Sequence, residues 1–262
     1  MHLISAVPDL RATIPGLHSH GLALYSPPYR AVLAATAQER DAAYRLRFRV
    51  FNLEFQEGLA EAFSTGADTD EFDKFCDHIN VEDERSGEVI GTYRLQSGDT
   101  AARNIGYYSE REFDFRPYDT IRGELIELGR ACIHPDHRKY EVLMLLWKAI
   151  TRYAVERRAR YLIGCSSLTS QDIAVGSAVY RALKPAMAPH NFRTKPLLSL
   201  ACEIDAQETQ ARPPKLLRTY LCLGAWICGE PAIDRDFKTI DFLTLLDLNN
   251  LAPSIRSRLI EL

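Results

Sequence analysis

The sequence predicts a mixed α/β fold with one central sheet, because short β-rich segments alternate with amphipathic helical segments along the chain. The segment EVIGTYRL, residues 88–95, alternates between two faces as a strand does. The apolar segments LIELGRACI (125–133) and YLIGCSS (161–167) are also expected to be strands. Between these two, apolar residues recur at helical spacing over residues 141–158. We therefore expect helices packed on a single sheet.

The chain before these strands is expected to contain an extension, a helix and a long loop. Residues 1–37 are rich in Pro, Gly and His without clean periodicity, so we interpret them as an N-terminal extension of a domain over 38–262. Asp41 is the predicted N-cap of a helix with aromatic residues at three- and four-residue spacing. The loop at residues 57–77 is rich in aspartate and longer than an ordinary connection, which favours a functional role.

The C-terminal half predicts two more helices and two more strands. A short helix is expected at residues 174–183, ended by Pro185. The segment LLSLACEI (197–204) is predicted to be a strand. A helix at 215–224 and a strand within 241–248 complete the domain.

Composition and charge exclude several classes of protein. The chain has 262 residues, 46% of them hydrophobic and 26% charged, which is typical of a globular protein with a real core. A formal charge of −3 argues against nucleic acid as the main partner but allows a local basic surface for an acidic protein. The six cysteines lack any regular spacing, so neither disulfides nor a metal site is predicted. With no secretory signal and no apolar segment of roughly 20 residues, we expect a cytoplasmic protein.

The most informative motif is ELGRACIHPDHRKYEVLMLLWKAI, a strand followed by a basic turn and an amphipathic helix. It resembles the core motif of the GNAT superfamily of acyltransferases, in which the turn and the helix N-terminus face the phosphates of the acyl carrier. The resemblance implies a GNAT fold, with a mixed central sheet flanked by helices and one splayed pair of strands. It also implies that Cys132, Ile133, Arg138 and Lys139 contact the phosphopantetheine arm of the carrier.

The turn of this motif departs from the superfamily. Residues 138–143 read RKYEVL, where the usual pattern supplies glycines. Without glycine the backbone cannot approach a pyrophosphate closely, which disfavours coenzyme A as the donor. The phosphopantetheine arm of acyl carrier protein carries a single phosphodiester, which requires a less close approach of the turn's backbone. We therefore expect acyl carrier protein as donor and partner, with no permanently bound cofactor.

A second resemblance covers residues 40 to about 250 and concerns the acyl-carrier-dependent branch of the superfamily. Arg47 with Val50 and Phe51, the acidic DTDEFDKFCDH, then GTYRL and ELGR occur in the order typical of ornithine acyltransferases, long-chain N-acyl amino acid synthases and, more distantly, acyl-homoserine lactone synthases. The tail PPKLLRTYLCLGAWICGEPAIDRDFKTIDFL looks like the end of the ornithine lipid enzymes in particular.

This likeness implies the residues of the site. Glu127 is the candidate general base, because aminolysis of a thioester requires an uncharged amine and a carboxylate can take the proton from the ammonium group. An arginine can bind the acceptor carboxylate with two parallel hydrogen bonds. Acidic residues suit a diamino acid, whose side-chain ammonium group must be held. The substrate-binding candidates are Arg94, Arg130, Asp70, Asp73 and Arg47.

A regular strand would send Glu127 and Arg130 to opposite faces, since they are three residues apart. A β-bulge between Leu128 and Cys132, which the resemblance implies, would bring both into one cleft. A backbone N–H near residues 131–133 would then meet the oxyanion of the thioester.

The sequence thus predicts transfer of a fatty or 3-hydroxyfatty acyl group from acyl carrier protein to the α-amino group of L-ornithine, giving lyso-ornithine lipid. Because that product is a lipid, peripheral contact with the inner membrane is expected. An N-acyl amino acid synthase with tyrosine or glycine as acceptor, and an acyl-homoserine lactone synthase, remain alternatives. From another class, a GNAT-fold module that binds lipid or carrier without turnover also remains open.

Overall fold

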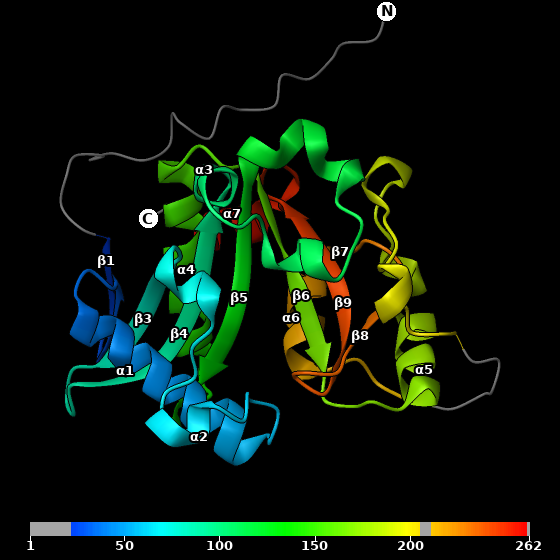
Figure 1. Ribbon diagram of the computed structural model, residues 1–262. Helices are drawn as coiled ribbons and strands as arrows, with labels where there is room; N and C mark the ends of the chain where they lie inside the picture. Colours follow the sequence, from blue (N-terminus) through cyan, green and yellow to red (C-terminus); the bar gives the residue numbers. More distant parts are fainter. Residues whose placement is uncertain (1–21, 205–210, 261–262) are drawn as a thin grey trace, which may run out of the picture.

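The computed structural model describes residues 22–204 and 211–260, and it shows one mixed α/β domain around a nine-stranded sheet (Figure 1). The strand order is β1-β2-β3-β4-β5-β6-β9-β7, with β8 also paired to β9. All pairs are antiparallel except β5 with β6. The strands are β1 (Ala23–Ser26), β2 (Tyr29–Leu33), β3 (Asp77–Asp83), β4 (Glu88–Ser97), β5 (Leu125–Ile133), β6 (Tyr161–Leu168), β7 (Trp226–Ile227), β8 (Ala232–Asp234) and β9 (Thr239–Asp247).

Helices cover both faces of this sheet. In Figure 1 helix α1 crosses one face over β3 and β4, and α4 lies behind the sheet on the other. Short 3-10 segments at 108–111 and 116–124 extend the cover on the α1 face. No helix of the described residues has the length and apolar character to cross a membrane. The α-helices are α1 (Ala37–Arg47), α2 (Ala62–Thr65), α3 (Gly98–Arg103), α4 (Tyr140–Glu156), α5 (Ile173–Leu183), α6 (Lys215–Cys222) and α7 (Pro253–Leu259).

The predicted elements with strong periodicity are confirmed. Strands β4, β5, β6 and β9 lie where alternation or apolar character predicts them. The helical spacing at 141–158 corresponds to α4, which buries apolar side chains such as Leu146 and Ile150 against the sheet. Helices α5 and α6 also lie at the predicted segments.

The predicted strand at 197–204 is wrong. The segment contains a single 3-10 turn, Leu198–Leu200, and one isolated bridge from Ala201 to Ala232. Its apolar residues do not share one sheet face, because Leu200 and Cys202 pack into two different clusters. Strand β3 was not expected from the sequence, since it buries polar side chains such as Asn80, whose amide donates to the Glu39 carbonyl oxygen.

The start of the domain also differs from expectation. Helix α1 is capped by Thr36 and not by Asp41: the Thr36 hydroxyl accepts from the Glu39 N–H at 3.1 Å, and the Glu39 carboxylate accepts from the Thr36 N–H at 2.8 Å. Within the segment interpreted as an extension, β1 and β2 form a hairpin that pairs with β3. Residues 1–21 of that segment lie outside the described part of the chain.

The predicted divergence of two central strands is confirmed. Strands β5 and β6 pair only where Leu125 to Glu127 face Tyr161 to Ile163, and beyond this point they separate (Figure 1). The predicted bulge is also present in β5, since Thr92 faces Cys132 while Arg94 faces Gly129. Arg130, inside the bulge, has a φ of +50°, a conformation that costs a non-glycine residue energy.

Gly164 sits where the two strands part. A Cβ atom at this position would overlap the carbonyl oxygen of Leu128, so only glycine allows β5 and β6 to approach each other here. The close approach at Gly164 therefore sets where the pairing ends.

We predict that Gly164→Ala lowers stability by about 1–3 kcal/mol, because one of the two strands must move away from the new methyl group. Urea unfolding followed by circular dichroism measures this loss. Gly123→Ala is the matched control, since a Cβ atom there meets nothing within 4 Å. Equal stability of the two variants would show that the approach of β5 to β6 tolerates a side chain.

Candidate active site

A cavity of about 1000 Å³ passes through the place where β5 and β6 diverge. Residues 127–133 of β5 and 162–167 of β6 line it along its length. Its lining contains side chains from both faces of the sheet, so it connects the α1 side with the α4 side. The two ends of the cavity differ in character.

The end on the α4 side is apolar. Leu143, Leu146 and Trp147 of α4 line it, together with Tyr93 of β4 and Tyr220 of α6. The hydroxyl groups of Tyr93 and Tyr220 hydrogen-bond to each other. Each hydroxyl therefore has a partner, so neither presents an unpaired polar group to a ligand. The compartment suits a hydrocarbon chain.

The end on the α1 side is polar and contains Glu127. This side chain is 6% exposed, and its two carboxylate oxygens accept the backbone N–H groups of Tyr108 and Ser109 at 2.8 and 2.7 Å. Burial raises the pKa of Glu127, and the hydrogen bonds from Ser109 and Tyr108 oppose that shift. Glu127 thus lines the cavity and also fixes the start of the 3-10 segment at 108–111.

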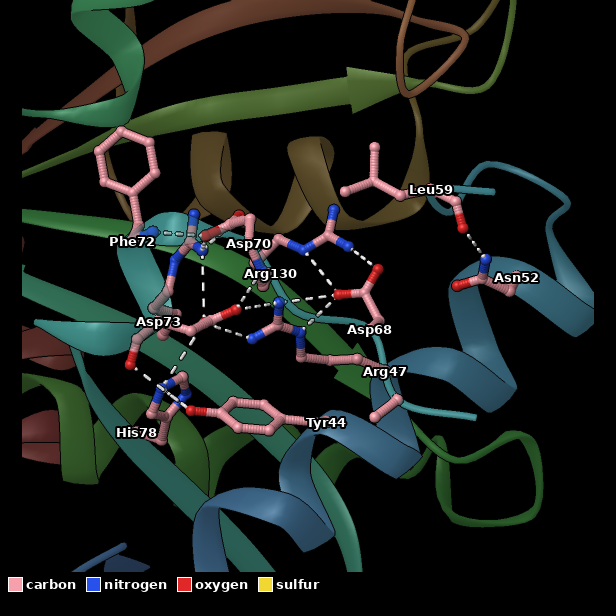
Figure 2. A network of polar contacts seen from close by, with 12 residues as sticks. Tyr44, Arg47, Asn52, Leu59, Asp68, Asp70, Phe72, Asp73, His78 and Arg130 are labelled. Atoms are coloured by element: carbon pink, nitrogen blue, oxygen red, sulfur yellow. Dashed lines mark hydrogen bonds and ion pairs between the residues drawn. The ribbon is translucent and has the colours of Figure 1, made fainter. Parts of the chain in front are cut away.

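A network of arginines and aspartates lies behind this polar end (Figure 2). Arg47 is fully buried and donates to Asp68 at 2.8 Å and to both oxygens of Asp73 at 2.7 and 2.9 Å. Burial alone would raise the pKa of Asp73, but Arg47 and Arg94 together hold it well below its usual range. Arg94 donates to Asp70 at 2.6 Å, so loop 68–73 is bound to helix α1 and strand β4.

Arg130 joins the same network from the bulge of β5. It pairs with Asp68, and its guanidinium group lies between the rings of Phe51 and Phe237, 4.5 Å from each ring centroid. Such stacking adds cation–π attraction to the ion pair. Both contacts hold Arg130 in its strained conformation at the cavity wall.

The structure therefore brings together the substrate-binding residues that the sequence predicts, but in two layers. Arg94 and Arg130 line the cavity, while Arg47, Asp70 and Asp73 lie behind them and do not. Asp68, which the sequence analysis did not select, pairs with both Arg47 and Arg130 and is fully buried.

The predicted carrier-binding residues lie at the cavity mouth and wall. Cys132 is buried, and burial raises the pKa of its thiol to about 12, so it is not a thiolate nucleophile. Arg138 donates to both oxygens of Glu54 at 2.6 Å, and one further bond goes to the Ile133 carbonyl oxygen. The exposed cations that line the mouth are Arg138, Lys139, Lys215, Arg218 and Arg258.

A second acidic group lies at the polar end. Atoms of Glu112, Cys165 and Asp241 that could bind a ligand are all within 4.8 Å of one another. Both carboxylates are 3% exposed. Burial raises the pKa of Asp241 to about 6, and burial with the nearby charges of Asp241 and Asp234 raises that of Glu112.

With this geometry established, comparison with known proteins identifies the family. Residues 46–148 match the family model described as an acetyltransferase (GNAT) domain. The L-ornithine N(alpha)-acyltransferase of Agrobacterium fabrum is 32% identical over 237 residues, which cover 84% of this chain and 81% of that protein. The enzyme of the same name from Rhodobacter capsulatus is 31% identical over 241 residues, with 87% and 93% covered. The chain belongs to this acyltransferase family. It is an N-acyltransferase.

Solved structures agree with the GNAT fold of the family. FeeM, an N-acyl amino acid synthase from uncultured soil microbes, superposes with a TM-score of 0.54 at 14% identity, over 86% of this chain and 95% of that chain. The acyl-homoserine lactone synthase BjaI gives a TM-score of 0.50 at 13% identity, over 86% and 84%. At these identities the likeness concerns the fold alone, and it confirms the GNAT fold that the sequence predicts.

Glu112, Cys165 and Asp241 of this acyltransferase are not among the site residues that the sequence predicts. Glu112 directly follows the 3-10 segment at 108–111, Cys165 lies in β6 and Asp241 lies in β9. Asp241 belongs to the tail that carries the family resemblance, whereas Glu112 and Cys165 lie outside those motifs. The pairing of β6 with β9, in which Cys165 faces Leu243 and Ser167 faces Asp241, brings Cys165 and Asp241 together, and the Cys165 thiol donates to the Glu112 carboxylate at 3.7 Å.

We predict that Arg47→Gln lowers the free energy of unfolding by about 3–5 kcal/mol, because it leaves Asp68 and Asp73 buried without their main cation. Arg45→Gln is the control in the same helix, since Arg45 forms an exposed pair with Asp41 that contributes at most about 1 kcal/mol. Chemical denaturation of both variants measures the difference. If Arg47→Gln lowered the free energy of unfolding no more than Arg45→Gln does, the network would not have a stabilising role.

Proposed function

We propose that this acyltransferase moves a fatty or 3-hydroxyfatty acyl group from acyl carrier protein to the α-amino group of L-ornithine, which gives lyso-ornithine lipid. The observation that carries the proposal is the cavity between β5 and β6, which joins an apolar compartment to a buried acidic one. A fatty acyl group and a diamino acid require these two environments. The relatives named L-ornithine N(alpha)-acyltransferase support ornithine as the acceptor.

The acyl chain occupies the apolar compartment between α4 and α6. Burial of each methylene group there contributes about 0.8 kcal/mol, so a long chain binds well without any polar contact. The thioester then lies in the slot between the diverging strands, where Cys132 and Ile133 form part of the wall. In this position the carbonyl carbon of the thioester lies beside Glu127 and Arg130.

The cavity mouth supports acyl carrier protein as the donor. Five exposed cations surround the mouth, although the chain as a whole has a formal charge of −3. Such a local basic surface attracts an acidic carrier and orients its phosphopantetheine arm. The turn at 138–143 offers no glycine to a pyrophosphate, which favours the carrier over coenzyme A.

Arg94 and Arg130 bind the carboxylate of the acceptor. Each lines the cavity and is held by aspartates on its other side, Arg94 by Asp70 and Arg130 by Asp68. A guanidinium group has five N–H donors, so each arginine retains donors for a second carboxylate. Arg47 and Asp73 position these two arginines from behind.

Glu127 is the general base. It takes a proton from the α-ammonium group, and the neutral amine attacks the thioester carbonyl carbon. The C–N bond forms first and gives a tetrahedral intermediate with an oxyanion. The C–S bond then breaks, and the second proton of the amine passes to the phosphopantetheine sulfur, which leaves as a thiol. A backbone N–H of residues 131–133, at the unpaired edge of β5, stabilises the oxyanion.

An acceptor with one amino group, such as tyrosine or glycine, defines the second candidate. The acidic pocket argues for a diamino acid, because glycine and tyrosine leave its carboxylates without a cation. The lipid product also implies transient contact with a membrane surface.

We predict that Glu127→Gln lowers kcat by on the order of 10² to 10⁴, because glutamine cannot accept the ammonium proton. Raising the pH should restore part of the rate, since more of the amine is then neutral. Steady-state assays with saturating donor measure both effects. Glu124→Gln, an exposed change three residues earlier, is the control and should keep full activity. If Glu127→Gln retained full kcat in its folded fraction, Glu127 would be only a structural partner of residues 108 and 109.

We predict that acyl carrier protein thioesters exceed the matching coenzyme A thioesters in kcat/KM by on the order of tenfold, and that added salt lowers this advantage. Lys139→Glu and Arg218→Glu should each raise KM for the carrier, while Arg85→Glu, an exposed change in the turn between β3 and β4, should not. Equal use of both donors without salt dependence would contradict carrier recognition at the mouth.

A further inference from the structure

We propose that Glu112 and Asp241 form a subsite that binds the side-chain ammonium group of a diamino acid acceptor. This inference rests on the proposed function and deepens it, because it names the residues that select ornithine over amino acids with uncharged side chains. Neither residue belongs to the arginine–aspartate network of Figure 2.

One buried oxygen identifies the subsite. Asp241 lines the cavity from β9 and is 3% exposed. Its carboxyl group hydrogen-bonds with Ser167, Thr239 and Glu112, but its Oδ1 atom has no donor of its own among the described residues. Glu112 lies behind Asp241, outside the cavity lining. Buried carboxylate oxygens are rarely left without a donor, so Oδ1 of Asp241 in the cavity wall points to a ligand that donates a hydrogen bond.

No cation of the described chain serves these carboxylates. The two carboxyl groups hydrogen-bond to each other, and their other main electrostatic partners are Asp234, Tyr108, Cys165, Thr239 and Ser167, none of which carries a positive charge. An unpaired buried carboxylate is costly, and an ammonium ligand removes that cost. An ammonium group has three donors in a compact charge, which matches two adjacent carboxylates.

The third nearby carboxylate is already satisfied. Asp234 accepts the Tyr108 hydroxyl at 3.0 Å through Oδ2, and the backbone N–H groups of Asp236 and Phe237 through Oδ1. Asp234 therefore holds Tyr108 and the β8–β9 turn in place. Within this group of three carboxylates, Glu112 and Asp241 are left to bind the ligand.

The position of Asp241 relative to Glu127 suits a diamino acid. Glu127 faces Ile163, and Asp241 faces Ser167 four residues further along β6, so both lie on the same face of the sheet and line the same cavity. Because β5 and β9 flank β6, their backbone positions are offset by roughly 13 Å along the strand and roughly 10 Å across it, which is roughly 16 Å in all. The two nitrogens of ornithine are about 6 Å apart when extended, and two N–O hydrogen bonds of about 2.9 Å bring the span to roughly 12 Å. The side chains of Glu127 and Asp241 cover the rest of the distance when ornithine binds between them.

The test compares L-ornithine with L-norvaline, which has the same carbon chain without the side-chain nitrogen. In the wild-type enzyme, ornithine should be used with a kcat/KM higher by on the order of 10- to 100-fold, the effect of one charged hydrogen bond. In Asp241→Asn and in Glu112→Gln, KM for ornithine should rise by a similar factor, while kcat/KM for norvaline stays within about threefold. Asp236→Asn removes the same charge from the exposed β8–β9 turn and should leave the preference unchanged.

Thermal unfolding provides a second measurement that does not depend on activity. Asp241→Asn should keep or raise the melting temperature of the free enzyme at pH 8, because the carboxylate has no cation to lose. Burial raises the pKa of Asp241 to about 6 from an ordinary value of 3.8, so its ionisation destabilises the fold as pH rises through this range. The difference in melting temperature between Asp241→Asn and the wild type should therefore be smaller at pH 4 than at pH 8. L-ornithine should raise the melting temperature of the wild type but not of Asp241→Asn.

Three results would overturn the subsite. The ratio of kcat/KM for ornithine to kcat/KM for norvaline could be the same in the wild type and in both variants. Both variants could unfold at all pH values, which would make the pair structural. Zn²⁺ could bind the wild type in calorimetry and be lost in Asp241→Asn, with activity abolished by chelation, which would make the three-residue group a metal site. Failure of the proposed function is distinct, since the wild-type enzyme would then acylate neither ornithine nor norvaline.

Discussion

The functional architecture depends on one interruption of backbone pairing: β5 and β6 stop being neighbours after Glu127 and Ile163. An unbroken parallel ladder would fill the centre of the sheet and separate its two faces completely. Because the strands diverge, one cavity reaches from the apolar layer under α4 to the polar layer under α1. Gly164 and the bulge at Arg130 are the local features that make the divergence possible, since one allows close approach and the other redirects β5.

The opened sheet needs another source of rigidity on the α1 face, and the arginine–aspartate network supplies it. Arg47, Arg94 and Arg130 come from α1, β4 and β5, and all three converge on loop 68–73. Three arginines against Asp68, Asp70 and Asp73 leave the network formally neutral. A neutral, hydrogen-bonded group of this kind can be buried, whereas a single unpaired arginine could not. The aspartates of this loop therefore lie behind the site wall and hold Arg94 and Arg130, which line the cavity.

The sequence allows the fold and about half of this site to be predicted, and the division has a physical basis. Elements with strong periodicity, such as α4 and β5, are determined by local burial and were predicted correctly. The strand expected at 197–204 failed because its apolar residues serve two separate clusters. Asp68 and Asp241 could not be selected, since their positions depend on contacts that are distant in sequence. Asp68 pairs with Arg130, 62 positions away, and Asp241 lies beside Cys165 through the β6–β9 ladder.

On the proposed function, charges in different parts of the cavity lining separate the two substrates. Its mouth presents five exposed cations, while at its polar end Asp241 lines the wall with Glu112 behind it, and no cation of residues 22–204 or 211–260 pairs with either carboxyl group. On the proposed function, an acidic carrier is attracted to the mouth, and a cationic acceptor is drawn to the opposite end. The two substrates then meet at Glu127 without competing for the same surface. The negatively charged carrier is kept away from Glu112 and Asp241, and the acceptor's cationic group is kept away from Lys139 and Arg218. The formal charge of −3 for the whole chain does not reveal this local arrangement.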